Sequence, residues 1–394
     1  MKRRRLPLDG ILVADFSRVL AGPLCTQLLA DTGARVIKIE EPSRGDETRR
    51  WGPPFIDGIS AYFLSVNRGK ESLALDLRND RDAEVAERLL ARADVVVDNF
   101  LPPQRAALGI ASARERFPRL VHCSISGYDR GTADANAPGY DLLAQAGAGL
   151  MSITGAADGE PMKAGVALAD VLTAHHAFGA INAALVARER TGEGASIEIS
   201  LFSATLASLV NVAQSALVTG REARRYGNAH PSIVPYQTFR GSDRTFAVGA
   251  GTDRHFRALC DSVLGDSALA DDARFTTNVL RVANRELLVA DLQQRFITKT
   301  ARAWVARCRK AGIPASLVQG VREALRSDAG RALVEQIEHP TIGTYDAVRN
   351  PLLFDGAPLP IGSAPPALGQ HNAKILRELG YSRREIAAMS VTHD

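Results

Sequence analysis

"ILVADFSRVLAGPLCTQLLADTGARVIKIE", residues 11–40, changes its hydrophobic pattern twice and decides the fold. Ile11–Phe16 is a short apolar run typical of a strand, and Ala34–Glu40 is a second one. Between them, Pro23–Gly33 has helical spacing and ends at glycine, a residue that commonly closes a helix. Two strands joined by a helix predict a β-α-β unit.

The same alternation returns further along the chain. Residues 82–93 (DAEVAERLLARA) predict a helix, and residues 94–100 (DVVVDNF) and 121–127 (VHCSISG) predict strands. Repeated units of this kind indicate an α/β fold, a Rossmann-like domain with a parallel sheet. Because ligands bind beyond the carboxyl ends of such strands, the candidate site loops lie within residues 15–23, 95–103 and 124–131.

The pattern divides the chain into parts. We expect residues 1–220 to form a large α/β domain and residues 221–329 a smaller α+β domain. Residues 330–394 begin rich in Pro and Gly and end in helical patterns, so we expect a return segment that completes the large domain. Within the large domain, residues 203–220 predict a further helical stretch.

Asp170 stands at the head of an otherwise apolar helical run within residues 162–194. One face of this helix is predicted to be buried, and it comprises Val171, Ala174, Phe178, Ile181 and Leu185. The simplest interpretation makes Asp170 an N-cap that accepts hydrogen bonds from free backbone N–H groups. The alternative is a nucleophile or proton-transfer group sheltered by apolar neighbours. The helical pattern alone leaves both interpretations open.

Composition restricts the class of protein. With 45% hydrophobic and 23% charged residues, the chain resembles an ordinary soluble globular protein. No apolar run approaches the roughly 18 residues needed to cross a bilayer, and residues 1–10 lack the apolar segment of a secretory signal. We therefore expect a cytoplasmic protein without a membrane partner. The net charge of +4 is spread among 44 acidic residues, which argues against nucleic acid as a partner.

Cysteine and histidine spacing predicts no metal site. Cys25, Cys123, Cys260 and Cys308 lie far apart and are expected to be buried small residues or free thiols. His175 and His176 are neighbours on a predicted helix and point about 100° apart, so we expect one to be buried and one exposed. His230 lies in a loop that is a candidate for a substrate contact.

Familiar catalytic motifs are absent from the sequence. It contains no G-x-S-x-G elbow, no Walker loop and no H-E-x-x-H pair. Gly249 and Gly251 follow a predicted strand but lack the third glycine of a dinucleotide loop. A nucleotide-dependent oxidoreductase stays open as an alternative, which the absorbance of a bound cofactor would reveal.

Several longer segments together resemble the class III CoA-transferases, a family that includes formyl-CoA:oxalate and carnitine CoA-transferases and shares its fold with α-methylacyl-CoA racemases. The segments occur in the family's order within residues 8–390, at 15–49, 62–78, 93–100, 124–131, 138–151, 162–194, 227–236 and 368–389. The resemblance implies an intertwined, ring-like homodimer. It also implies no tightly bound cofactor, with a coenzyme A thioester and a carboxylic acid as substrates.

The resemblance further implies the site residues. The family's nucleophilic aspartate falls on Asp170, and Gly139 and Tyr140 fall beside it in the site. The positions that line the CoA site fall on Leu20, Ala21, Leu75, Asp76, Leu77, Arg78, Asn99, Phe100, Leu101, Pro138 and Asp141.

Three departures from the family pattern bear on the substrate. An arginine that contacts the nucleotide end of CoA in oxalate-using relatives is Glu41 here. A second frequent arginine is Ala107, with Arg105 nearby as a substitute for CoA binding. The glycine-rich loop that covers the active site in those relatives reads HPSIVP here, residues 230–235. These departures argue against a formyl or oxalyl substrate.

The two branches of this fold differ in their chemistry. A racemase needs proton-transfer groups on both faces of the α-carbon, and the histidine of the related racemases is Tyr140 here, whose ordinary pKa near 10 makes it a poor base. We therefore favour CoA transfer through a covalent aspartyl intermediate on Asp170. Racemization and a catalytically silent acyl-CoA binder remain the alternatives. Candidate oxyanion donors are the backbone at Gly139, Gly249 and Gly251 and the hydroxyl of Tyr140.

Overall fold

The computed structural model describes residues 5–390. The chain divides into two compact units, each described by itself below. The large unit contains residues 1–150, 163–221 and 331–394, and the small unit contains residues 151–162 and 222–330.

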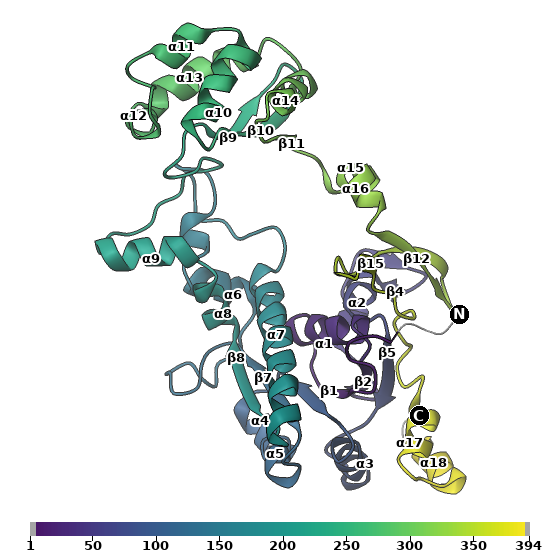
Figure 1. Cartoon of the computed structure of the whole chain (residues 1–394). Helices are drawn as coiled ribbons and strands as arrows, with labels where there is room; N and C mark the ends of the chain where they lie inside the picture. The colour runs from purple at the N-terminus through teal and green to yellow at the C-terminus, as the bar shows by residue number, and fades with distance from the viewer. Residues whose placement is uncertain (1–4, 391–394) are drawn as a thin grey trace. The chain divides into compact units, whose positions relative to one another are not determined.

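A sheet of six parallel strands forms the centre of the large unit (Figure 1). The strands are β1 (Leu12–Asp15), β2 (Arg35–Glu40), β5 (Lys70–Ala74), β6 (Val95–Asp98), β7 (Val121–Ser126) and β8 (Ser196–Ser200). Their order across the sheet is β5-β2-β1-β6-β7-β8, and every adjacent pair is parallel. The predicted parallel α/β fold is confirmed. Because the strand order reverses between β1 and β6, their carboxyl ends form the crevice where ligands bind in open sheets of this kind.

Helices cover both faces of this sheet. Helices α1 (Ala21–Asp31) and α7 (Leu168–Thr191) pack on one face, where Cys25, Leu29 and Ile181 share a core with the sheet residues Val13 and Val97. Helices α3 (Asp80–Leu90), α17 (Asn372–Glu378) and α18 (Arg383–Ser390) cover the other face. The residues that pack there include Val85, Leu89, Ile375, Leu376 and Ile386. Burial of two apolar faces fixes the sheet between the helix layers.

Shorter elements complete the large unit. Its other helices are α2 (Ala61–Val66), α4 (Pro102–Ala107), α5 (Ala113–Arg116), α6 (Asp141–Gly147), α8 (Leu201–Ala207) and α9 (Val210–Thr219). Its two-stranded hairpins pair β3 (Phe55–Ile56) with β4 (Ile59–Ser60), β12 (Val334–His339) with β13 (Gly343–Val348), and β14 (Leu353–Phe354) with β15 (Ala357–Pro358).

Residues 331–390 return to the large unit and attach to strand β5. The side chain of Asn372 accepts a hydrogen bond from the backbone N–H of Ala74 at 2.9 Å, and the ring of His371 accepts one from Ser72 at 3.1 Å. These bonds dock the beginning of α17 beside the edge strand, so the last part of the chain belongs to the fold that the first part builds.

The stretch 203–220 is not one continuous helix. Helices α8 and α9 meet at an angle of 77° across the break at residues 208–209. Val210 has a φ of 36°, outside the range of a right-handed helix, and the hydroxyl of Ser208 binds the carbonyl oxygen of Ala204 at 2.7 Å. The hydrophobic pattern does not show such a backbone bend.

The small unit combines a three-stranded antiparallel sheet with helices. The sheet order is β11-β10-β9, with β9 (Tyr236–Arg240), β10 (Thr245–Gly249) and β11 (Ala315–Leu317). The helices are α10 (Asp253–Ala258), α11 (Ser267–Asp271), α12 (Asn278–Ala283), α13 (Arg285–Phe296), α14 (Ala301–Lys310), α15 (Val321–Arg326) and α16 (Asp328–Arg331). Four aromatic rings, Phe239, Phe246, Phe296 and Trp304, pack in its core.

Residues 151–162 cluster with the small unit, although the sequence predicted them in the large domain. The guanidinium of Arg225 donates hydrogen bonds to the carbonyl oxygens of Ser152, Ala156 and Gly159. These bonds join two segments that are about seventy residues apart in sequence, a contact that the composition of either segment does not reveal.

Among residues 5–390, no single helix is long and apolar enough to cross a membrane, while the bent pair α8 and α9 passes that test by length and composition taken together. All four cysteines are buried free thiols, as expected. In the same range, no group of three or more His, Cys, Asp or Glu residues is arranged to hold a metal ion.

Candidate active site

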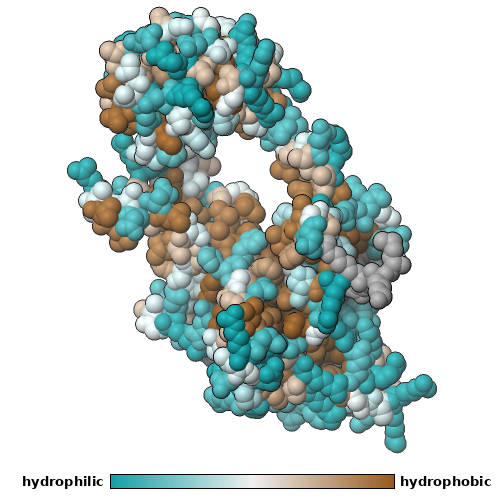
Figure 2. Space-filling model, viewed as in Figure 1, coloured by the Kyte–Doolittle hydropathy of each residue, from teal (hydrophilic) through white to brown (hydrophobic). Residues whose placement is uncertain are grey.

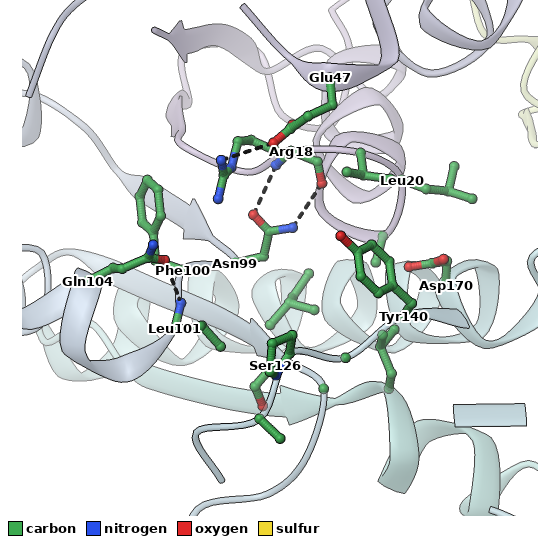
Figure 3. A pocket seen from close by; sticks show the side chains of 18 of the residues that line it. Arg18, Leu20, Glu47, Asn99, Phe100, Leu101, Gln104, Ser126, Tyr140 and Asp170 are labelled. Carbon is green, nitrogen blue, oxygen red and sulfur yellow. Dashed lines mark hydrogen bonds and ion pairs between the residues drawn. The ribbon is translucent and has the colours of Figure 1, made fainter. Parts of the chain in front are cut away.

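A cavity of about 240 Å³ lies at the carboxyl ends of β1 and β6, where the strand order reverses (Figure 3). Its walls come from the loops after β1, β6 and β7 and from the first turns of α7 and α8. The lining residues are Arg18, Val19, Leu20, Ala21, Glu47, Asn99, Phe100, Leu101, Gln104, Ile125, Ser126, Gly127, Ala135, Ala137, Pro138, Gly139, Tyr140, Asp170 and Leu201.

Nine of the residues that the sequence assigned to the site line this cavity together. They are Leu20, Ala21, Asn99, Phe100, Leu101, Pro138, Gly139, Tyr140 and Asp170. The three candidate loops therefore meet at one place in the structure.

Asp170 is the third residue of α7, and its carboxylate lies in the cavity wall (Figure 3). The N-cap of the helix is Ala167, so the interpretation of Asp170 as an N-cap is wrong. Its carboxylate accepts a hydrogen bond from the backbone N–H of Ala21, the first residue of α1. The side chain is thus held at the junction of two helix N-termini and is not used to close its own helix.

Burial raises the pKa of Asp170 from its ordinary 3.8 to about 7, and the negative charge of Asp141 raises it further in the same direction. The hydrogen bond from Ala21 opposes the rise but does not cancel it. Burial is therefore the largest of the three effects on the pKa of Asp170. A weakly solvated carboxylate that ionises near neutral pH is suited to nucleophilic attack.

Asp141 positions the beginning of α7 and is not part of the cavity lining. One of its carboxyl oxygens accepts a hydrogen bond from the backbone N–H of Ala169 at 2.8 Å, and the other accepts one from the side chain of Gln145 at 2.7 Å. Gln145 in turn accepts a bond from the backbone N–H of Ala164 at 2.8 Å. Asp141 therefore acts as a cap supplied by another helix, and its expected CoA contact is not what its side chain does here.

The segment before Asp141 requires a glycine. A Cβ atom on Gly139 would lie 2.2 Å from the Cα atom of Gly127, and a Cβ on Gly127 would lie 2.5 Å from that of Gly139. The two backbones pack directly on each other, which brings the loop after β7 to the cavity wall. The next side chain, Tyr140, is 61% exposed, and it lines the cavity beside Asp170 (Figure 3).

The predicted residues after β5 do not line this cavity. Leu75 is buried in the core and Leu77 packs against it, while Asp76 and Arg78 form an exposed ion pair at 2.8 Å. Glu41 follows β2; burial acts to raise its pKa, but hydrogen bonds from Ser43 and Arg44 outweigh burial and lower the pKa, and the charge of Arg78 adds a smaller contribution in the same direction. These residues lie further along the carboxyl edge of the same sheet.

Arg105, the expected substitute for CoA binding, does not line this cavity. It is only 2% exposed and forms an ion pair with Asp98 at 2.9 Å, so its guanidinium holds the end of β6. Asn99 lines the cavity, but both ends of its amide are engaged. Its oxygen accepts from the backbone N–H of Arg18 at 3.0 Å, and its nitrogen donates to the carbonyl oxygen of Arg18 at 2.8 Å (Figure 3).

Sequence reasoning missed several residues of the site. Burial, with the charges of Asp170 and Asp141, raises the pKa of Tyr62 to about 12, so its hydroxyl keeps its proton at neutral pH and can donate a hydrogen bond. Arg18 and Glu47 form an ion pair at 3.1 Å in the cavity wall (Figure 3). Arg18 lies in the candidate loop 15–23 but was not singled out there, while no motif marks Glu47 or Tyr62.

The remaining histidine and glycine candidates lie elsewhere. His175 and His176 are both exposed on α7, which corrects the expectation that one is buried. His230, Gly249 and Gly251 belong to the small unit, whereas Gly139 and Tyr140 belong to the large unit with Asp170.

Comparisons with known proteins agree with this fold and identify the family. The sequence profile of CoA-transferase family III matches residues 8–372. Succinyl-CoA:glutarate CoA-transferase of Mus musculus is 39% identical over 378 residues, covering 95% of this chain and 86% of that protein. Acetyl-CoA:oxalate CoA-transferase of Acetobacter aceti is 40% identical over 321 residues, covering 81% and 82%.

A crystal structure of a CAIB/BAIF family protein from Brucella suis has a TM-score of 0.85 and 39% sequence identity, covering 95% of this chain and all of that one. The family profile, the two relatives and this structure each match more than four fifths of the chain. The chain therefore belongs to CoA-transferase family III and is a class III CoA-transferase.

Proposed function

We propose that this enzyme moves coenzyme A from an acyl-CoA to a carboxylic acid through a covalent intermediate on Asp170. The observation that carries the proposal is a carboxylate whose pKa is raised to about 7, placed in the wall of the switch-point cavity and hydrogen-bonded by the N–H of Ala21. A carboxylate poised to ionise near neutral pH, with donors beside it, meets the needs of a nucleophile for a thioester.

The proposed chemistry balances without a further reagent. The Asp170 carboxylate attacks the thioester carbonyl, the carbon–sulfur bond breaks, and an acyl-aspartyl anhydride and CoA thiolate result. The thiolate then attacks the aspartyl carbonyl, releases the first acid as its carboxylate and leaves an aspartyl-CoA thioester. The acceptor carboxylate attacks this thioester, the carbon–sulfur bond breaks, and a new anhydride and CoA thiolate result. The thiolate then attacks the acceptor's carbonyl carbon in this anhydride, forms the new CoA thioester and releases the Asp170 carboxylate.

Donors near Asp170 support these steps. Each attack places negative charge on a carbonyl oxygen, and fixed donors stabilise such an oxyanion. The hydroxyl of Tyr140, which lines the cavity, is one candidate donor, and the hydroxyl of Tyr62, whose pKa the charge of Asp170 helps to raise, is another.

We expect the CoA body to lie along the carboxyl edge of the sheet. The loop residues at 75–78 follow β5 and those at 99–101 follow β6, and β2 and β1 lie between these strands. Binding along this edge is remote from the reacting carbonyl and would hold the thiolate ready for its return. We propose a cytoplasmic location, which the four unpaired cysteines support.

The first donor and acceptor to test are succinyl-CoA and glutarate, because a relative that is 39% identical is named for this pair. The assay separates CoA esters after incubation of the wild-type enzyme with succinyl-CoA and either glutarate or oxalate. We expect glutaryl-CoA to form at least about tenfold faster than oxalyl-CoA. Solvent deuterium entering the α-carbon of a 2-methylacyl-CoA, without any CoA transfer, would instead support racemization.

Asp141→Asn is expected to shift the pH dependence of kcat/KM. The nucleophile must be deprotonated, so wild-type kcat/KM should rise with pH through a pKa near 7. Burial causes most of this elevation, and the negative charge of Asp141 adds to it. Removing that charge should lower the pKa of Asp170. The acid limb of the profile, where kcat/KM rises with pH, should therefore move to lower pH by at least about half a unit.

The control for this measurement is Asp94→Asn. Asp94 precedes β6 at the amino edge of the sheet, where it binds the backbone N–H of Leu12 at 2.8 Å and Arg188 at 3.0 Å. Its replacement should leave the acid limb in place. An unchanged limb in Asp141→Asn, or an equal shift in both variants, would mean that Asp141 does not act on Asp170.

We also propose that the enzyme is a homodimer. Helix α9 exposes apolar side chains on the surface, where hydrophobic residues gather in Figure 2, and Leu217 is the most exposed of them at 79%. Exposed apolar helix faces commonly pair with a partner. Sedimentation should give twice the 42.2 kDa chain mass for the wild type and a lower mass for Leu217→Asp. Val279→Asp, on α12, is the control; a monomeric wild type would refute the dimer.

A further inference from the structure

The loop between β1 and α1 has a strained residue next to the cavity. Val19 has a φ of 71°, in the left-handed region that a β-branched side chain rarely adopts. Two residues later, Ala21 begins α1 and its N–H binds Asp170. The direction of that N–H therefore depends on the conformation of the loop.

Hydrogen bonds hold the backbone of Ser17 and Arg18, the two residues before Val19. The backbone N–H of Ser17 binds Asp15 at 3.0 Å, and both the N–H and the carbonyl of Arg18 bind the side-chain amide of Asn99. Gly22 lies against Ser17, since a Cβ atom on Gly22 would be 2.2 Å from the Cβ of Ser17. The loop has little freedom except at Val19 and Leu20.

Asp46 holds Val19 itself. The two carboxyl oxygens of Asp46 lie 3.2 and 3.4 Å from the backbone nitrogen of Val19 and share its N–H. Asp46 is 1% exposed, and it also accepts hydrogen bonds from the backbone and the hydroxyl of Thr48, at 2.9 and 2.7 Å. A strained backbone conformation persists only where surrounding groups hold it, and Asp46 is the group that binds this residue's N–H.

Lys38 connects Asp46 to the loop between β1 and α1. Its buried ammonium lies 2.9 Å from Asp46 and donates to the carbonyl oxygen of Ser17 at 2.8 Å. Burial acts to raise the pKa of Asp46, but the charge of Lys38 and the bonds from Thr48 outweigh it and lower the pKa to about 2. Asp46 is therefore ionised throughout the range in which the enzyme would work.

We propose that Asp46 is a positioning residue of the active site: its buried pairing with Lys38 holds Val19 in the left-handed conformation, so that the N–H of Ala21 holds the Asp170 carboxylate in its attacking orientation. Asp46 does not line the cavity. The inference rests on the proposed role of Asp170 as the nucleophile and adds to it a residue 124 positions earlier in the chain.

The first test compares Asp46→Asn with the wild type. The amide cannot accept from Val19, Lys38 and Thr48 together, so Val19 should leave its strained conformation and Ala21 should release Asp170. We expect kcat to fall by roughly tenfold to a hundredfold, with the KM for acyl-CoA changed less than about threefold. In the wild type the hydrogen bond from Ala21 lowers the pKa of Asp170, so its loss should raise that pKa. The acid limb of kcat/KM should then move to higher pH by at least about half a unit.

The matched control is Asp31→Asn. Asp31 is an equally buried acid of the same unit, paired with Arg68 at 2.6 Å, and it lies at the other end of α1. Its replacement should lower stability without moving the acid limb. If Asp31→Asn and Asp46→Asn change kcat and the acid limb equally, Asp46 only supports folding and the proposal is wrong.

A second, independent test asks whether a substitution at Val19 restores the activity lost in Asp46→Asn. Glycine adopts a φ of about 70° without strain, so Val19→Gly should make the loop less dependent on Asp46. The kcat of the double variant should be at least about threefold higher than that of Asp46→Asn. If Asp46→Asn does not fold, Asp46→Glu keeps the charge beside Lys38 while displacing the carboxylate from Val19, and the same comparison applies. No rescue by Val19→Gly in either background would overturn the proposal.

Measuring the pKa of Asp170 without any CoA transfer tests this inference independently of the proposed function. Carboxyl-carbon NMR titration, with Asp170 assigned by its loss in Asp170→Asn, gives the pKa of Asp170 directly. A higher pKa in Asp46→Asn supports the positioning role even if the wild type transfers no CoA, in which case only the proposed function fails. An unchanged pKa contradicts the positioning role even in an active transferase.

Discussion

Asp170→Asn should lower kcat for CoA transfer by at least about a thousandfold. Asparagine has nearly the same shape, but its amide is a poor nucleophile and cannot form the anhydride that the proposed mechanism requires. Since the CoA body is expected to bind along the sheet edge, the dissociation constant for acyl-CoA should change less than about threefold. Steady-state kinetics and calorimetric titration of acyl-CoA measure the two quantities.

Stability serves as the control for Asp170→Asn. The pKa of Asp170 is about 7 in the folded protein and 3.8 as its ordinary value, so the folded protein binds a proton more tightly than the unfolded chain. Stability from this group is therefore present below pH 4 and is lost as pH rises towards 7. The neutral asparagine avoids that loss, and at pH 8 its Tm should equal or exceed that of the wild type. A variant that kept substantial transfer activity would show that Asp170 is not the nucleophile.

Gly139→Ala should have the largest effect on the fold of the site. Its new Cβ atom would lie 2.2 Å from the Cα of Gly127, and neither backbone can move without displacing the loop after β7. We expect a loss of at least about 3 kcal/mol of unfolding free energy and of most activity, because Tyr140 and Asp141 follow directly in the chain. Denaturant unfolding and kcat/KM measure these effects.

Gly179→Ala is the matched control in the same unit. Gly179 lies within α7, and apart from the backbone of its own helix no atom lies within 4 Å of a Cβ placed on it. Alanine favours a helix interior over glycine, so this variant should gain roughly 0.5–1 kcal/mol and keep full activity. If Gly139→Ala were as stable as the wild type, the close packing of the two backbones would not be needed.

The sequence was sufficient to predict the parallel sheet and the loops that carry the site. Apolar strands alternate with helical segments, and the carboxyl ends of parallel strands share one edge, so the loops after β1, β6 and β7 had to meet. The candidate nucleophile, by contrast, came from the resemblance to a family. The pattern around Asp170 alone fitted an N-cap equally well, and only the structure places Ala167 in that position.

Contacts between distant segments account for what the sequence did not reveal. Arg105 was expected to take the place of the family's arginine at Ala107, but its guanidinium pairs with Asp98 at the end of β6. The side chain of Asp141 is likewise engaged by a distant segment, because it caps a helix that begins 27 residues later. Asp46 shows no motif either, and its importance comes from Val19, whose backbone strain is invisible in a string of residue types.

The most direct test of the covalent mechanism is to trap the intermediate. The wild-type enzyme is incubated with succinyl-CoA and hydroxylamine, and its peptides are mapped by mass spectrometry. We predict a hydroxamate on Asp170, formed only when the CoA ester is present and absent from Asp170→Asn. Rapid CoA transfer with no hydroxamate on Asp170, or with one on another carboxylate, would contradict the mechanism.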